Sequence, residues 1–145
     1  MPQNKDLQLA SDLRTVVTRL IKKLRKETVT GQQLSLTERS TLSLLHQHKA
    51  LLPNELASME KITNQSMSQI LSHLLELGYI SRTASATDKR KVLISLTTAG
   101  EKILLQVRSE RDEWLANAIK NTCTSEEEAL IKKAIGPLTK LVDFE

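Results

Sequence analysis

Residues 88–100 read DKRKVLISLTTAG, and this stretch decides the fold. It begins with a charged run, continues with the mainly apolar residues 92–96, and reaches Thr97, a residue type that often caps the start of a helix. A second strand-like stretch, residues 79–82, lies before it, and the polar loop 83–91 separates the two. The sequence therefore predicts a β-hairpin with a basic tip, followed by a helix.

Helical patterns surround this hairpin on both sides. Apolar residues recur at helical spacing over 6–28, and Thr37 and Thr63 are suitable N-caps for helices that end near His48 and Gly78. Pro53 is suited to the first position of a short helix between these two. The order is helix, helix, short helix, helix, hairpin, helix, helix.

Two helices are expected after the hairpin. Thr97 caps the first of them, and Ser125 with Glu128 has the spacing of a capping box for the last. The expected fold class is mainly α with a small β-hairpin wing, that is, a six-helix winged helix-turn-helix with a helical dimerisation region from both termini.

Length and composition limit the alternatives. A chain of 145 residues fits one domain, and its net charge of +4 suits contact with a polyanion. The single Cys123 excludes an intramolecular disulfide, and the first ten residues have no apolar segment of the kind found in secretory signals. We expect a cytoplasmic protein without a membrane partner.

The stretch 88–100 resembles the D-x-R and L-T-x-x-G signature of the MarR family of regulators, and residues 56–57 and 74–80 are also similar to that family. The resemblance implies one domain over 1–145: dimerisation helices at 1–33 and 122–145, a winged helix-turn-helix DNA-binding region at 34–100, and a connecting helix at 97–121. It also implies a homodimer, an operator with two half-sites and, often, release by a small ligand.

The chain departs from this family at one turn. Relatives commonly have an apolar residue and then a glycine where this chain has Glu60 and Lys61. A lysine is strained at a positive φ angle, which glycine adopts freely. The geometry of the turn between the two helices is therefore left open.

The wing carries the expected anchor for DNA. A narrow, electronegative minor groove attracts an inserted guanidinium, and Arg90 lies near the tip of the loop, where Asp88 could hold it extended. Arg82, Lys89 and Lys91 are then candidate phosphate contacts, which add affinity without sequence information. The alternative is a solvated hairpin tip with no partner.

The second helix of the pair has a polar outer face without lysine or arginine. Amides and hydroxyls suit adenine edges and phosphates better than guanine, so we expect an A·T-leaning half-site read mainly by Gln65 and Gln69. The alternative is that some of these side chains only face solvent. The candidate DNA contacts on this helix are Asn64, Gln65, Ser66, Ser68, Gln69 and Ser72.

A small-molecule effector is expected from the resemblance, in a pocket between the dimerisation helices and the winged region. The candidate residues are His46, Arg111 and Trp114, because a cation beside an apolar wall suits an aromatic carboxylate. Trp114 on a leucine stripe is also a common core arrangement. His46 and His48 are two positions apart on a helix and point in different directions, so no metal site is expected.

The sequence favours a DNA-binding transcriptional regulator, a repressor that competes with RNA polymerase at a double-stranded operator. The alternative is a winged-helix protein-interaction module without a DNA role. The sequence offers no nucleophile-base pairing and no glycine-rich phosphate loop, so we expect no catalytic residues, no cofactor and no enzymatic activity. Cys123 has no nearby resolving cysteine and is not expected to act as a redox sensor.

Overall fold

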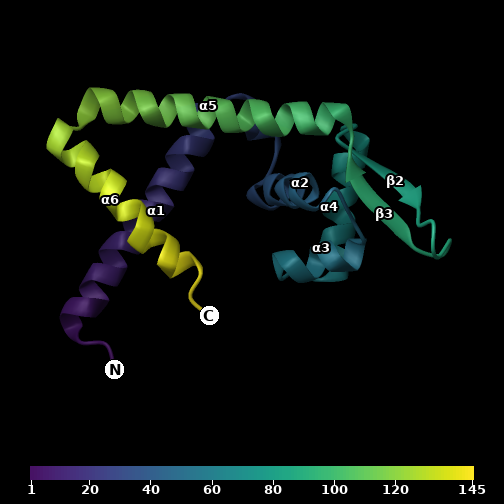
Figure 1. Cartoon of the computed structure of the whole chain (residues 1–145), viewed down its shortest axis with the longest axis horizontal. Coiled ribbons are helices and arrows are strands. Elements are labelled where there is room, and N and C mark those ends of the chain that lie inside the picture. Colours follow the sequence, from purple (N-terminus) through teal and green to yellow (C-terminus); the bar gives the residue numbers. More distant parts are fainter.

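The computed structural model describes residues 1–30 and 32–145. It confirms the mainly α winged helix-turn-helix, with six α-helices and a small sheet among these residues. The long helix α5 spans one side of the molecule, the winged region lies at one of its ends, and α1 and α6 lie at the other end, where they cross in the view of Figure 1. In chain order the elements are α1 (Asn4–Glu27), the 3-10 helix η1 (Thr30–Gln33), α2 (Leu36–His48), β1 (Ala50–Leu51), α3 (Pro53–Glu60), α4 (Asn64–Glu76), β2 (Ile80–Ala84), β3 (Val92–Leu96), α5 (Thr98–Thr122) and α6 (Ser125–Val142).

The hairpin is part of a three-stranded antiparallel sheet with the order β1-β3-β2. Strands β2 and β3 pair from Ile80 opposite Leu96 to Ala84 opposite Val92. The short strand β1 adds to the other edge of β3, where Leu51 faces Ile94. The sequence predicted the hairpin but not β1, because two residues are too short to show an alternating pattern.

The core lies in the winged region. Leucines of α2 and α3, Met67 and Leu74 of α4, and Ile94 of β3 are almost fully buried together. Burial of one such side chain stabilises the fold by about 1.5–3 kcal/mol. By contrast, α1 and α6, all of whose residues are described, bury none of them.

The start of α2 differs from the sequence prediction. Thr37 was expected to be its N-cap, but Ser35 has that role and the helix begins at Leu36. The Ser35 hydroxyl accepts a hydrogen bond from Glu38 N at 3.1 Å, and a Glu38 carboxylate oxygen accepts one from Ser35 N at 2.8 Å. A reciprocal pair satisfies two free amides, and this favours Ser35 over Thr37.

A similar correction applies to α6. Ser125 and Glu128 were expected to form its capping box, but the pair is Thr124 and Glu127, one residue earlier. Thr124 N donates to the Glu127 carboxylate at 2.9 Å, and Glu127 N donates to the Thr124 hydroxyl at 3.1 Å. The caps expected at Thr63 and Thr97 are both confirmed.

The two helices of the helix-turn-helix, α3 and α4, end in turns of the same type that use different residues. In α3, Ile62 N donates to Ala57 O and Lys61 N to Ser58 O, the pattern of a Schellman motif. Lys61 has φ 57° and ψ 42°, in the left-handed region. Gly78 has the corresponding position after α4, with φ 80°. The turn geometry that the sequence left open therefore includes a positive φ at Lys61.

The T-x-x-G segment joins the wing to α5. The Thr97 hydroxyl donates to Gly78 O at 2.6 Å and accepts from Gly100 N at 3.0 Å. A Cβ atom on Gly100 would lie 2.0 Å from Tyr79 O, so only glycine allows this close approach.

Among the described residues, no helix is both long and apolar enough to cross a membrane.

Candidate DNA-binding interface

The outer face of α4 is polar and free of contacts with the core. Its apolar residues Met67, Leu71 and Leu74 point into the winged region. All six polar candidates of this helix are exposed: Asn64, Gln65, Ser66, Ser68, Gln69 and Ser72. The start of α4 is set by Thr63, whose hydroxyl accepts a hydrogen bond from Ser66 N at 3.0 Å. A helix N-terminus of this kind favours an anion such as a phosphate.

The wing tip is organised by Asp88. Its carboxylate accepts hydrogen bonds from Arg90 N at 3.1 Å and from Arg90 Nε at 3.2 Å, so it fixes both the turn and the direction of the guanidinium. The arginine side chain is nonetheless 91% exposed. These bonds from the Arg90 side chain and backbone lower the pKa of the Asp88 carboxyl. The contact expected between the two residues is present, and the cation remains accessible.

Arg82 connects the wing with both helices of the helix-turn-helix. Together with Ser68 and Ser72 of α4 it lines a small cavity. Together with Arg90 and Lys91 it lines a groove beside the start of α3. Arg82, Lys89 and Lys91 are all exposed. The structure thus brings the wing candidates and part of the α4 face to one side of the winged region.

Asn54 is a further candidate contact that the sequence pattern did not indicate. It lines the groove of Arg82, Arg90 and Lys91 at the second position of α3, next to Pro53. Its amide can donate to a phosphate, and the positive end of a helix dipole lies at the same place. No local sequence signal identifies it, since its position follows from the packing of α3 against the wing.

A polar contact holds α4 against the start of α2. Nδ1 of His73 on α4 contacts Oε2 of Glu38, the residue that also completes the cap of α2. Burial desolvates the Glu38 carboxyl and favours its neutral form, but hydrogen bonds from Ser35 and His73 outweigh this and lower its pKa. The side chain that positions the end of α4 is therefore an ionised, largely buried carboxylate.

The three effector candidates do not line one cavity. His46 is exposed and lies 3.7 Å from a Glu101 carboxylate oxygen, in a groove beside Leu96. Trp114 is half-buried and lines a different groove, together with the carboxylates of Glu27, Glu110 and Glu113. Arg111 is also half-buried and lines neither groove.

Comparison with known proteins gives consistent results. A family model described as the MarR family matches residues 34–92. An uncharacterised HTH-type transcriptional regulator of Mycobacterium bovis is 32% identical over 138 residues, which cover 95% of each chain. The crystal structure of a transcriptional regulator of Pseudomonas aeruginosa superposes with a TM-score of 0.88 at 32% identity, over 99% of this chain and 100% of the other.

A structure of MarR from E. coli shows the same fold. This protein, a point mutant complexed with operator DNA, superposes with a TM-score of 0.66 at 20% identity, over 93% of this chain and 96% of that one. The winged helix-turn-helix described above is thus common to both proteins.

Proposed function

The chain belongs to the MarR family of DNA-binding transcriptional regulators, and from this we propose that it represses transcription as a homodimer on a two-half-site operator and is released by a small acidic ligand. The main observation in support of DNA binding is that the Arg90 side chain is exposed at the wing tip and held in its direction by Asp88. A directed guanidinium is suited to a narrow minor groove. The complex between MarR and operator DNA supports a duplex as the partner.

The α4 helix would then enter the major groove. Its exposed face offers amides and hydroxyls, and Gln65 and Gln69 are suited to bidentate bonds with adenine. Arg82, Lys89 and Lys91 would contact phosphates beside the groove. We expect an operator with A·T-rich half-sites, which also gives the narrow minor groove that Arg90 requires.

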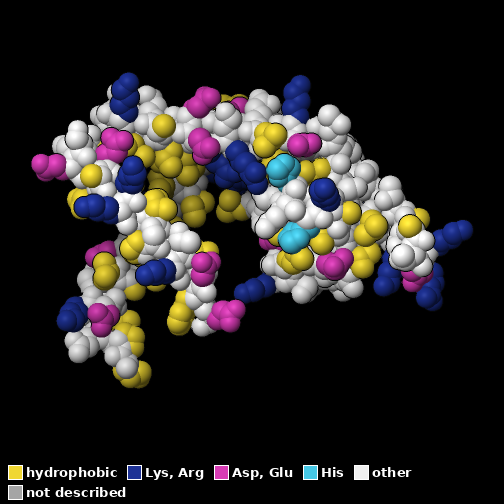
Figure 2. Space-filling view, viewed as in Figure 1, with side chains coloured by type: hydrophobic (Ala, Val, Ile, Leu, Met, Phe, Trp, Pro, Cys, Tyr) yellow, Lys and Arg dark blue, Asp and Glu magenta, His cyan; other side chains and the backbone are white. Residues whose placement is uncertain are grey.

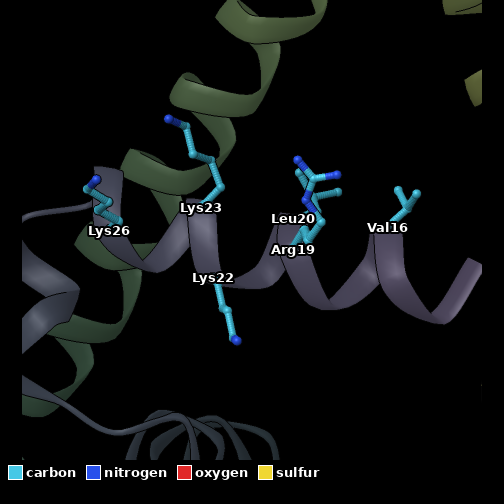
Figure 3. A pocket seen from close by; sticks show the side chains of 6 residues that line it. All are labelled: Val16, Arg19, Leu20, Lys22, Lys23 and Lys26. Atoms are coloured by element: carbon cyan, nitrogen blue, oxygen red, sulfur yellow. The ribbon is translucent and has the colours of Figure 1, made fainter.

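The homodimer is supported by the terminal helices. Large apolar side chains of α1 and α6 are more than one third exposed, among them Leu9, Val16, Ile131 and Leu141. On α1, Val16 and Leu20 lie on one face beside Arg19 and Lys23, whereas Lys22 points the other way (Figure 3). Contiguous apolar surface of this kind marks an interface. Residues 1–33 and 122–145 would therefore form the dimerisation region, joined to the DNA-binding region 34–100 by 97–121.

The DNA proposal is tested by Arg90→Ala. A labelled duplex is first selected by the wild-type protein from a randomised pool at low salt, and binding is then measured by fluorescence anisotropy. Loss of the anchor should weaken binding by about 5-fold to 150-fold, as expected for about 1–3 kcal/mol. The control is Lys120→Ala, which removes the same charge at the far end of α5, about 33 Å from its start.

Two outcomes would contradict the proposal. Equal affinity of Arg90→Ala and wild type would remove the wing from the interface. Failure of the wild-type protein to select any duplex would favour a winged-helix protein-interaction module, since true DNA binding is strong at low salt and weakens steeply as salt rises.

A further inference from the structure

His73 is the one side chain of α4 that can carry a positive charge, because this helix contains no lysine or arginine. Gln65, Gln69 and His73 follow one another at intervals of four residues, so the three side chains lie along one side of the helix. The histidine side chain is 45% exposed. Figure 2 shows histidine side chains exposed on the helical part of the winged region, whereas lysine and arginine side chains gather at the wing tip. A cationic contact between the side chains of α4 and a duplex therefore depends on His73.

Glu38 determines which nitrogen of the imidazole ring carries a proton. Nδ1 of His73 contacts Oε2 of Glu38. Hydrogen bonds that lower the pKa of the Glu38 carboxyl keep it ionised near neutral pH, and an ionised carboxylate can only accept a hydrogen bond. Nδ1 is therefore the donor in this contact. Since a neutral imidazole has a single N–H group, Nε2 of the neutral ring is an acceptor.

Protonation changes Nε2 from an acceptor into a donor. The neutral Nε2 presents a lone pair, which repels a phosphate oxygen, whereas an imidazolium ring donates from both nitrogens. Its Nδ1–H group stays on Glu38, and its Nε2–H group can bind a second anion. Among the described residues, Glu38 is the one polar partner of this ring. A charged ring thus has one donor directed to the protein and one that is open to a ligand.

The other charged groups around α4 do not contact this ring. The elements that pack against the helix are α2, α3 and β2. The titratable and charged side chains of these elements and of α4 itself are Glu38, Arg39, His46, His48, Glu55, Glu60, Glu76 and Arg82. Only Glu38 contacts the imidazole in the part of the chain that the structure describes. Arg82 lies beside Ser68 and Ser72 instead. Protonation of the ring therefore meets a carboxylate and no cation in direct contact.

We propose that His73 binds a phosphate of the duplex through Nε2 only when its ring is protonated, so that α4 holds DNA more tightly in mildly acidic solution. Histidine is the side chain that normally changes charge between pH 5 and 8. A phosphate oxygen accepts the Nε2–H group, and such a contact adds affinity without sequence information. The inference rests on the proposed entry of α4 into the major groove. It makes His73 an anchor that depends on pH, unlike Arg90, whose guanidinium stays charged.

Binding of the selected duplex at pH 6 and pH 8, measured by fluorescence anisotropy over a series of salt concentrations, tests the inference. The wild-type protein should bind about fivefold to tenfold more tightly at pH 6, as expected for one hydrogen bond to a charged group. The slope of log K against log salt should also be steeper at pH 6 by about 0.9, the value for one additional phosphate contact. His73→Gln, which keeps an amide donor for Glu38, should lose both differences.

Two further variants make the result specific to this ring. His46→Gln combined with His48→Gln leaves His73 as the one histidine of the chain, and this protein should respond to pH like the wild type. His73→Lys carries a cation at both pH values and should bind at pH 8 about as tightly as the wild type binds at pH 6. The Tm of each variant at both pH values shows that the protein is folded.

Three outcomes would overturn the inference while DNA binding itself stands. The first is equal affinity and equal salt slope of the wild type at both pH values, and the second is a pH response that survives in His73→Gln. The third is a pH response that His73→Gln removes although the salt slope of the wild type does not change with pH; His73 would then position α4 without binding a phosphate. A wild-type protein that binds no duplex at either pH contradicts both the proposed function and this inference.

Discussion

Replacement of Lys61 by glycine should stabilise the protein. Lys61 ends α3 in the left-handed region, at φ 57° and ψ 42°, and its side chain is exposed. The backbone bonds of the turn, Ile62 N to Ala57 O and Lys61 N to Ser58 O, do not depend on the side chain. The substitution therefore changes the backbone preference at one residue and little else.

The magnitude follows from two opposing terms. A residue with a Cβ atom costs roughly 1–2 kcal/mol in the left-handed region, and glycine avoids that cost. Glycine also adds freedom to the unfolded chain, which costs about 0.5–1 kcal/mol. The free energy of unfolding should thus rise by about 0.5–1 kcal/mol, which corresponds to a Tm increase of roughly 2–3 °C for a chain of this length.

Urea unfolding at a fixed protein concentration measures this difference. Lys61→Ala is the matched control, because it removes the same side chain but keeps the strained Cβ, and it should give no gain. Gly78→Ala is the reciprocal test: the added Cβ meets no atom within 4 Å, so the expected loss of about 1 kcal/mol is purely conformational. Equal stability of Lys61→Gly and Lys61→Ala would refute the reasoning.

Two further predictions concern the joints of the winged region. Gly100→Ala should lower the free energy of unfolding by about 2–4 kcal/mol. The added Cβ would lie 2.0 Å from Tyr79 O, so the wing must separate from α5. A loss below about 0.5 kcal/mol in urea unfolding would contradict this contact. Glu38 has a lowered pKa in the folded state, so its contribution to stability is present above its ordinary pKa of about 4.5 and is lost as the pH falls through the lowered value. Glu38→Gln should cost about 1–2 kcal/mol at neutral pH and reduce the dependence of Tm on pH below 5; an unchanged slope would exclude Glu38 as its source.

Local signals predicted much of the fold. Thr63 and Thr97 were identified as caps because each precedes an apolar helical pattern directly. The caps of α2 and α6 were misplaced where two candidate residues lie close together. At α2 the choice depends on Glu38, whose carboxylate returns to Ser35 N, and the sequence prediction had considered only Thr37.

In the candidate site, too, local sequence signals predict some contacts and not others. Asp88 and Arg90 are neighbours in the chain, so their contact could be expected from spacing alone. Asn54 could not be recognised, because its place in the groove of Arg82, Arg90 and Lys91 results from the packing of α3 against the wing. The His73–Glu38 contact joins residues 35 positions apart and has no local signal either.

The length of α5 has a mechanical consequence. Its 25 residues form a rod of about 37 Å that connects the wing, at Thr97, to the terminal helices. Adjacent operator half-sites lie about 34–36 Å apart, so the spacing of two wings depends on the angle at which each rod is held. A tilt of about 5° at one end displaces the other end by roughly 3 Å, close to the rise of one base pair. In the proposed homodimer on a two-half-site operator, a small change in this angle would therefore put both wings out of register with the duplex.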